Sequence, residues 1–147
     1  FIMDREGLST SDIRDILSKK SGLLGISGIS GDMRDLQVAA ESGHQRAKLA
    51  VDAFCYGTKK QIAAMAAAMG GVDAIAFAGG IGERGIDVRR QVCEGLEFLG
   101  VRIAMKSNDQ GPPERVISQP HSPVDVVIVN TNEEIIVARE SVRFLQA

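Results

Sequence analysis

The sequence predicts an α/β fold in which helices pack on a sheet. Short apolar runs typical of strands alternate with amphipathic helical patterns through residues 73–145. A glycine cluster separates the first of these runs from the helical pattern that follows it. The length of 147 residues is enough for one domain with a buried core.

Composition argues against several classes of protein. The 17 basic and 19 acidic residues form no long run of one sign, so we expect no nucleic-acid or membrane partner. Trp is absent and there is a single Tyr, which leaves no aromatic surface for stacking bases. No apolar stretch approaches the ~20 residues of a membrane helix. Cys55 and Cys93 lie far apart in helical patterns and predict two buried, reduced thiols of a cytoplasmic protein.

The first elements are expected to be short. Residues 9–17 begin with capping side chains and carry their apolar side chains on one face, which predicts a short helix. Residues 21–31 predict a loop with at most a short strand, because glycines and serines interrupt the apolar residues too often for a helix. Asp32 is the expected N-cap of the next helix, and Gly43 is its stop.

A long helix is predicted over residues 44–69, where apolar residues recur at steps of three and four. The alanines of residues 63–68 allow a neighbouring helix to approach closely. We expect Met65 and Met69 to lie in the core.

Residues 73–90 are the stretch around which the second half is organised. A strand is predicted at residues 74–78, a glycine turn follows, and a helix then continues to Leu99. A strand that ends in glycines and turns into a helix brings bare backbone N–H groups and the positive end of a helix dipole to one place. The stretch therefore predicts a site for a phosphate or a nucleotide.

The remaining elements are two strands, a loop and a helix. A strand is expected at residues 101–105 and a loop at residues 106–114. Residues 124–129 are apolar nearly throughout, which predicts a strand covered on both faces. Thr131 and Glu134 stand in capping-box register at the start of the last helix, which leaves Glu133 without a structural role beyond that of a first-turn carboxylate.

The glycine cluster leaves alternatives open. Residues 80–85 match G-x-G-x-x-G, but Met105 and Lys106 stand where a Rossmann unit places its acidic residue, about 20 positions on. NAD binding therefore remains an alternative, as does a tight turn without a ligand. A P-loop is excluded because no Lys-Ser or Lys-Thr closes the glycines. His44 and His121 have no partners at useful spacing and are expected at the surface.

Four segments carry a resemblance to a known family. Residues 21–36 (SGLLGISGISGDMRDL), 47–84, 92–101 and 129–139 closely resemble the C-terminal lobe of the acetate and propionate kinases. The resemblance implies one lobe of the actin/hexokinase/Hsp70-like (ribonuclease H-like) fold, with a mixed sheet flanked by helices. It also implies that residues 1–147 are the nucleotide-binding lobe, without its N-terminal partner lobe.

The resemblance implies an activity for the parent protein. This activity is the reversible, Mg²⁺-dependent transfer of a phosphoryl group from ATP to acetate, giving acetyl phosphate. The family's phosphoryl-transfer residues precede the position of Phe1, so we expect this chain alone to be inactive. Propionate and butyrate are alternative substrates. The family also implies a homodimer formed through this lobe, and a dimerisation module is the alternative of another class.

The resemblance finally implies which residues bind ATP or ADP. Gly80 and Ile81 are expected against the nucleotide, and Glu133 matches the family's magnesium-associated glutamate. Arg84 departs from the family, which commonly carries Asn there. The expected nucleotide-binding residues are Asp32, Met33, Arg34, Gly79, Gly80, Ile81, Gly82, Glu83 and Arg84.

Overall fold

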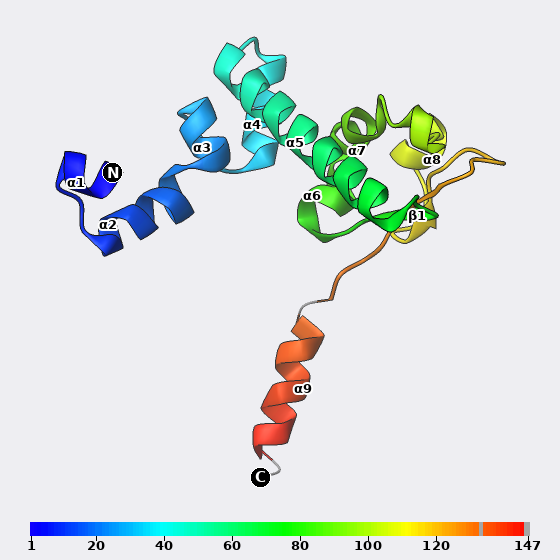
Figure 1. The fold of residues 1–147 in the computed structure, drawn as a ribbon. Helices are drawn as coiled ribbons and strands as arrows, with labels where there is room; N and C mark the ends of the chain where they lie inside the picture. The colour runs from blue at the N-terminus through cyan, green and yellow to red at the C-terminus, as the bar shows by residue number, and fades with distance from the viewer. Residues whose placement is uncertain (133, 146–147) are drawn as a thin grey trace. The chain divides into compact units, whose positions relative to one another are not determined.

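A computed structural model describes residues 1–132 and 134–145. The chain divides into two compact units, Phe1–Ile62 and Ala63–Ala147. The boundary falls within the long helix α5, Gln45–Met69, which is drawn as one continuous helix in Figure 1. Within the described ranges, no helix combines the length and the apolar character needed to cross a bilayer.

The first unit is helical throughout its described elements. Ser9 begins α2 with a capping box, in which its hydroxyl accepts from the Asp12 N–H and the Asp12 carboxylate accepts from the Ser9 N–H. The predicted helix over residues 9–17 is therefore confirmed at its start, although it passes into a π-helical turn. The elements are α1 (Ile2–Glu6), α2 (Thr10–Asp15), the π-helical turn (Ile16–Lys20), α3 (Gly22–Ser27), α4 (Met33–Glu41) and the first part of α5.

The loop predicted at residues 21–31 is wrong, because this segment contains the helix α3. Gly22 and Gly28 adopt left-handed backbone angles, with φ of 60° and 76°, and lie at the first position and the C-cap of the helix. Arg46 completes the C-terminal end, since its guanidinium donates to the Ile26 and Gly25 carbonyls at 2.9 and 3.2 Å. The glycines therefore bound a short helix instead of preventing one.

Helices α4 and α5 form as predicted. Asp32 caps α4 through its carboxylate, and Gly43, with φ of 89°, follows its end. His44 lies at the surface and caps α5, because its Nδ1 accepts from the Ala47 N–H at 3.0 Å. The core placement of the α5 methionines is wrong.

Met65 and Met69 are 55% and 68% exposed, whereas Ala66 is 2% exposed. Successive residues of a helix are rotated by about 100° around its axis. The buried face of α5 therefore includes Ala66 but not Met65 or Met69.

The second unit is built on a three-stranded mixed sheet in the order β1-β3-β2, and β1 is labelled in Figure 1. Strand β1 (Ala74–Phe77) pairs parallel with β3 (Asp125–Ile128), and β2 (Arg115–Val116) pairs antiparallel with β3. The helices are α6 (Gly79–Arg84), α7 (Ile86–Cys93), a 3-10 turn (Glu97–Leu99), α8 (Met105–Asp109) and α9 (Glu134–Leu145). The apolar core of this unit comprises Ala66, Ile75, Phe77, Val88, Val92, Cys93, Leu96, Val101, Ile117, Val124, Val126 and Ile128.

Several predicted boundaries in this unit are wrong. The helix expected to reach Leu99 ends at Cys93, because Gly95 takes a φ of 84° that stops it. The strand expected at residues 101–105 is reduced to single bridges from Val101 and Ile103. Helix α8 replaces the first part of the predicted loop.

Strand β2 was not predicted, and β3 alternates between exposed or half-exposed and buried residues, so the strand is not buried on both faces. The cysteines follow their prediction, since Cys55 and Cys93 are both buried thiols.

Candidate functional site

The glycine turn begins directly after β1. Gly79 is the first residue of α6 and has a left-handed φ of 67°, which favours glycine at this position. A Cβ added at Gly79 or Gly80 would meet no heavy atom within 4 Å, and Gly80 is exposed. The start of α6 is therefore open on the side where a Cβ would stand, while the Gly79 backbone N–H is also hydrogen-bonded to the Glu83 carboxylate.

The next two glycines serve packing. A Cβ at Gly82 would lie 3.0 Å from the carbonyl carbon of Phe77, and one at Gly85 would lie 2.5 Å from the Ile81 carbonyl oxygen. Gly82 therefore lets α6 approach the end of β1, and Gly85 fits the break between α6 and α7. The cluster that reads as one motif in the sequence has an open part and a packed part.

Arg89 holds the packed part in place. This side chain is fully buried and donates from Nη1 to the carbonyls of Gly82 and Glu83, at 2.7 and 2.9 Å. These carbonyls belong to the last turn of α6, where the helix dipole favours a cation. Burial lowers the pKa of the Arg89 guanidinium, and Arg115 lowers it further. The sequence analysis missed this residue, which resembles a solvated arginine on a helix.

Glu83 contacts a segment far along the chain. Its Oε1 accepts from both the backbone N–H and the hydroxyl of Thr131, at 2.9 and 2.8 Å. These two hydrogen bonds lower the pKa of the Glu83 carboxyl, and a hydrogen bond from the Gly79 backbone and the charge of Arg84 lower it further. The expected capping box of Thr131 is wrong, because its hydroxyl donates to Glu83 and the Asn132 side chain accepts from the Ile135 N–H.

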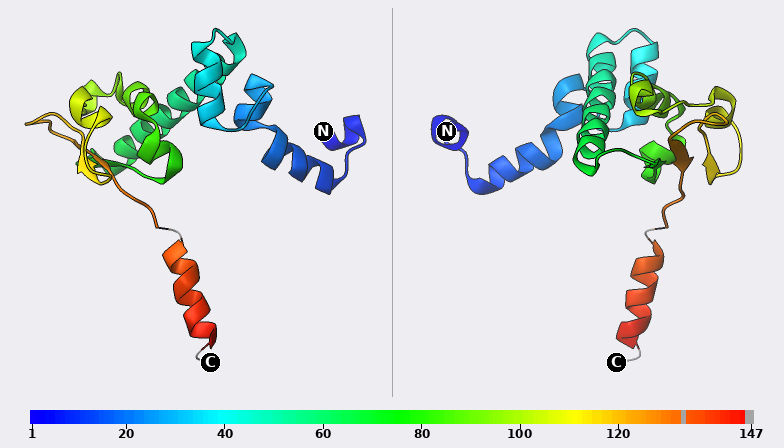
Figure 2. Two further views of the ribbon diagram at one scale, coloured as in Figure 1. Left: turned by 180° about the vertical axis from the view of Figure 1, so that it is seen from behind. Right: turned by 45° about the vertical axis from the view of Figure 1, so that its right-hand side comes forward.

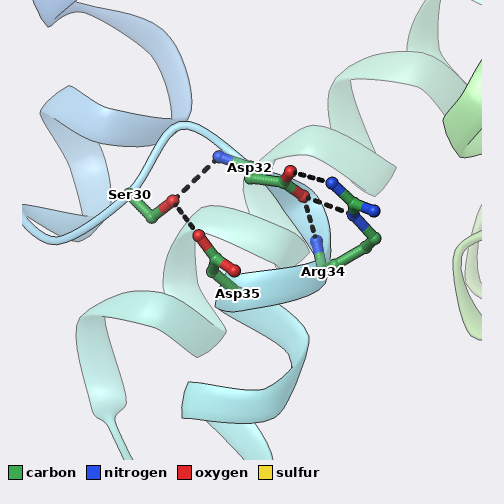
Figure 3. Close-up of polar contacts among 4 residues, drawn as sticks. All are labelled: Ser30, Asp32, Arg34 and Asp35. Atoms are coloured by element: carbon green, nitrogen blue, oxygen red, sulfur yellow. Dashed lines mark hydrogen bonds and ion pairs between the residues drawn. The ribbon is translucent and has the colours of Figure 1, made fainter.

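The Asp32 carboxylate organises the start of α4 (Figure 3). It accepts from the backbone N–H of Arg34 at 2.8 Å and from the Arg34 guanidinium at 3.1 and 2.6 Å. These bonds lower the pKa of Asp32 to about 2. Ser30 donates to Asp35 and accepts from the Asp32 N–H, which fixes the turn before the helix. The Arg34 side chain is 78% exposed, so its guanidinium remains accessible while it is oriented.

Comparison with known proteins assigns the chain to a family. Residues 1–139, which are most of the chain, match the model of the acetokinase family. The chain belongs to the acetokinase family.

Curated members of the acetokinase family resemble this chain closely. The acetate kinase of Staphylococcus carnosus is 49% identical over 98% of this chain, and that of Carboxydothermus hydrogenoformans is 48% identical over 99%. This chain spans 36% of the length of each of these relatives. The similarity therefore concerns about a third of the family's length.

Solved structures of acetokinase family members share the fold. Porphyromonas gingivalis acetate kinase matches with a TM-score of 0.86 and 43% identity, covering 99% of this chain and 37% of that one. A propionate kinase from Francisella tularensis matches with a TM-score of 0.82 and 35% identity, covering 95% and 35%. These neighbours confirm the predicted α/β, actin/hexokinase-like fold.

The expected site residues of this acetokinase family member are distributed over both units. Asp32, Met33 and Arg34 lie in the first unit, whereas residues 79–84 lie in the second. Met33 is buried, with 4% of its surface exposed. Within the second unit, Ile81 and Glu83 are half-buried and Arg84 is exposed at the end of α6. Glu133 lies outside the described residues.

The described side chains contain no cluster of three or more His, Cys, Asp or Glu residues that could hold a metal ion. Mg²⁺ usually keeps several waters and takes one or two carboxylates together with phosphate oxygens of the substrate. A single carboxylate supplied by this family member is therefore compatible with Mg²⁺ that arrives with a nucleotide.

Proposed function

We propose that the protein containing this chain transfers a phosphoryl group reversibly between ATP and acetate, giving acetyl phosphate, and that this chain is its C-terminal nucleotide-binding lobe. The observation that carries the proposal is the match to the acetokinase family over residues 1–139. Relatives that are 44–49% identical are named acetate kinase, which supports acetate as the acceptor. The propionate kinase neighbour supports propionate as the alternative.

The uncovered main chain at Gly79 and Gly80 is the proposed contact surface for the nucleotide. Ile81, which is half-buried beside this turn, flanks the adenine in this proposal. Gly82 supports the turn through its packing against Phe77. Arg84 supplies an exposed cation at the end of α6. Within the first unit, Arg34, oriented by Asp32, is proposed as a polar group for the ribose or phosphates.

Mg²⁺ is the proposed cofactor, with Glu133 as its carboxylate. Bound to the nucleotide, it would neutralise charge on the phosphate oxygens. This lobe alone supplies one side of the transferred group, and phosphoryl transfer requires positioning and charge neutralisation from both sides. The isolated chain is therefore expected to be inactive.

The proposal also includes a cytoplasmic homodimer that associates through this lobe. Exposed apolar side chains support an interface, since Met65 and Met69 of α5 are more than half exposed. Light scattering tests this part, and a dimer without nucleotide affinity would favour the dimerisation module instead.

The test is an assay of the full-length protein with ATP, Mg²⁺ and acetate, in which acetyl phosphate is trapped as the hydroxamate. We expect turnover with acetate, and propionate and butyrate measured in parallel rank the acyl acceptors. The 147-residue chain assayed alone is expected to show none. No acyl phosphate from the full-length protein with any of the three acids would contradict the proposal, and a thermal shift with NAD but none with ATP would favour the NAD-binding alternative.

A further inference from the structure

The glycine turn depends on contacts with other parts of the chain for its position. Helix α6 has only six residues, and three of them are glycines. A helix this short and this rich in glycine is not stable by itself. One set of contacts is exposed, since the Glu83 carboxylate accepts from the Gly79 backbone and from Thr131. A second set is buried and comes from Arg89 of α7.

Arg89 holds the end of α6 through one of its three nitrogens. Its Nη1 donates to the Gly82 and Glu83 carbonyls at 2.7 and 2.9 Å. A guanidinium carries its five N–H donors in one rigid plane, so the bonds of Nε and Nη2 decide the direction in which Nη1 points. Both of these nitrogens donate to the same residue, Asn108.

Asn108 fixes the plane of the Arg89 guanidinium. Its side-chain oxygen accepts from Nε at 2.7 Å, and its backbone carbonyl accepts from Nη2 at 2.8 Å. Its amide donates to the carbonyl of Ile86, the first residue of α7, at 3.0 Å. Asn108 is fully buried and belongs to α8, which lies against α7, as α7 does against α6; Figure 2 draws these helices in green to yellow.

The backbone of Asn108 is itself held in place. Arg115 of β2 donates from Nη2 to the Asn108 carbonyl at 2.9 Å and from Nε to the Ser107 carbonyl at 2.6 Å. These carbonyls lie in the last turn of α8, where the helix dipole favours a cation. The Asn108 N–H also donates to the Ala104 carbonyl at 2.9 Å. Asn108 is therefore a fixed point, joined to the sheet through Arg115, from which Arg89 reaches to the glycine turn.

We propose that Asn108 is a positioning residue for the nucleotide, which acts by orienting Arg89 and thereby fixing the glycine turn. This inference rests on the proposed function, in which the nucleotide lies against Gly79 and Gly80. The side-chain hydrogen bonds of Asn108 reach Arg89 and Ile86, and neither is an expected nucleotide-binding residue. Without the Asn108 side chain, the turn loses its fixed position and the affinity for nucleotide falls.

The test uses the full-length protein and its Asn108→Ala variant, with Leu96→Ala as a control. Leu96 is 1% exposed and lies in the same unit, so both changes remove a fully buried side chain and both lower stability. The Leu96 side chain is apolar and cannot hydrogen-bond to the end of α6. All measurements are made at a temperature at which circular dichroism shows each variant to be folded.

Binding of Mg-ADP is measured by calorimetry, and KM is measured for ATP and for acetate. We expect Asn108→Ala to bind Mg-ADP about tenfold more weakly and to raise the KM for ATP by a similar factor. The KM for acetate should be unchanged, because the expected acetate pocket precedes Phe1. Leu96→Ala should match the wild type in all three quantities, since a loss of stability alone does not move the turn.

Asn108→Asp separates the orientation of Arg89 from a general loss of packing. An aspartate at this position keeps an oxygen acceptor for the Arg89 Nε and loses only the donor to Ile86. We expect its affinity for Mg-ADP to stay within about threefold of the wild type. If Asn108→Ala does not fold, Asn108→Ser takes its place with the same expected loss, because its shorter side chain does not reach the Nε.

The possible failures are distinguishable. Wild-type affinity for Mg-ADP in Asn108→Ala, or an equal loss of affinity in Leu96→Ala or Asn108→Asp, overturns the positioning role and leaves the proposed function standing. If the wild-type protein binds no Mg-ADP, the proposed function fails and this inference fails with it.

Discussion

Arg89 and Asn108 form a buried pair that contains a cation but no carboxylate. The Arg89 Nε donates to the Asn108 side-chain oxygen at 2.7 Å, and its Nη2 donates to the Asn108 carbonyl at 2.8 Å. The Asn108 amide in turn donates to the Ile86 carbonyl at 3.0 Å. Both side chains are fully buried, so the pair ties α6, α7 and α8 together around the glycine turn.

Replacement of Arg89 by Leu is expected to destabilise the protein by about 2–4 kcal/mol, because buried carbonyl and amide oxygens lose their donors. Urea unfolding of the full-length variant measures the loss. Arg90→Leu is the matched control, since the Arg90 side chain is 43% exposed and its ion pairs measure 3.4 and 3.8 Å. We expect the control to change stability by about 0.5 kcal/mol or less. Equal losses in the two variants would contradict the role given to Arg89.

The pair of Gly82 and Gly80 provides a second prediction. Gly82→Ala places a Cβ 3.0 Å from backbone atoms of Phe77 that cannot easily give way, so a loss of about 1–3 kcal/mol is expected. Gly80→Ala places its Cβ in open space inside a helix, where Ala is favoured over Gly by up to about 1 kcal/mol. Unfolding curves of both variants decide the matter, and the interpretation fails if Gly80→Ala is the more damaging change.

The pKa of the Asp32 carboxyl is expected to be about 2, below the ordinary value of 3.8, chiefly because of the hydrogen bonds that it accepts from Arg34. A pKa lowered by folding contributes stability that is fully present above about pH 4 and is lost as the pH falls toward 2. The pKa of Asp32 is measured from the ¹³C chemical shift of its carboxyl carbon, followed as a function of pH. Arg34→Met should return the pKa toward 3.8, and a wild-type Asp32 that already titrates there would refute the pairing.

Local signals in the sequence predicted the elements that depend on neighbouring residues. Asp32 and Gly43 bound α4 as expected, and the strand after Asp73 forms where an apolar run ends in glycines. The same signals failed to predict helix boundaries that depend on the backbone angles of glycines. Gly22 and Gly28 bound a helix where a loop was expected, and Gly95 ends a helix that the apolar pattern continues.

Contacts between distant residues could not be predicted from local patterns. Arg89 meets a partner 19 positions away, and Glu83 meets one 48 positions away. Neither spacing is fixed by a helical or strand period. The glycine pattern and the resemblance predict a site at the glycine turn, but the division of its glycines into an open pair and a packed pair required the structure.

Binding of Mg-ADP to the full-length protein, measured by calorimetry on Gly80→Val and Gly57→Val, tests the central claim most directly. Both glycines lie in helices, and a Cβ at either position meets no heavy atom within 4 Å. If the uncovered turn lies against the nucleotide, Gly80→Val weakens binding by tenfold or more, while Gly57→Val binds like the wild type. Equal affinities for all three proteins would contradict the claim that the nucleotide binds at this turn.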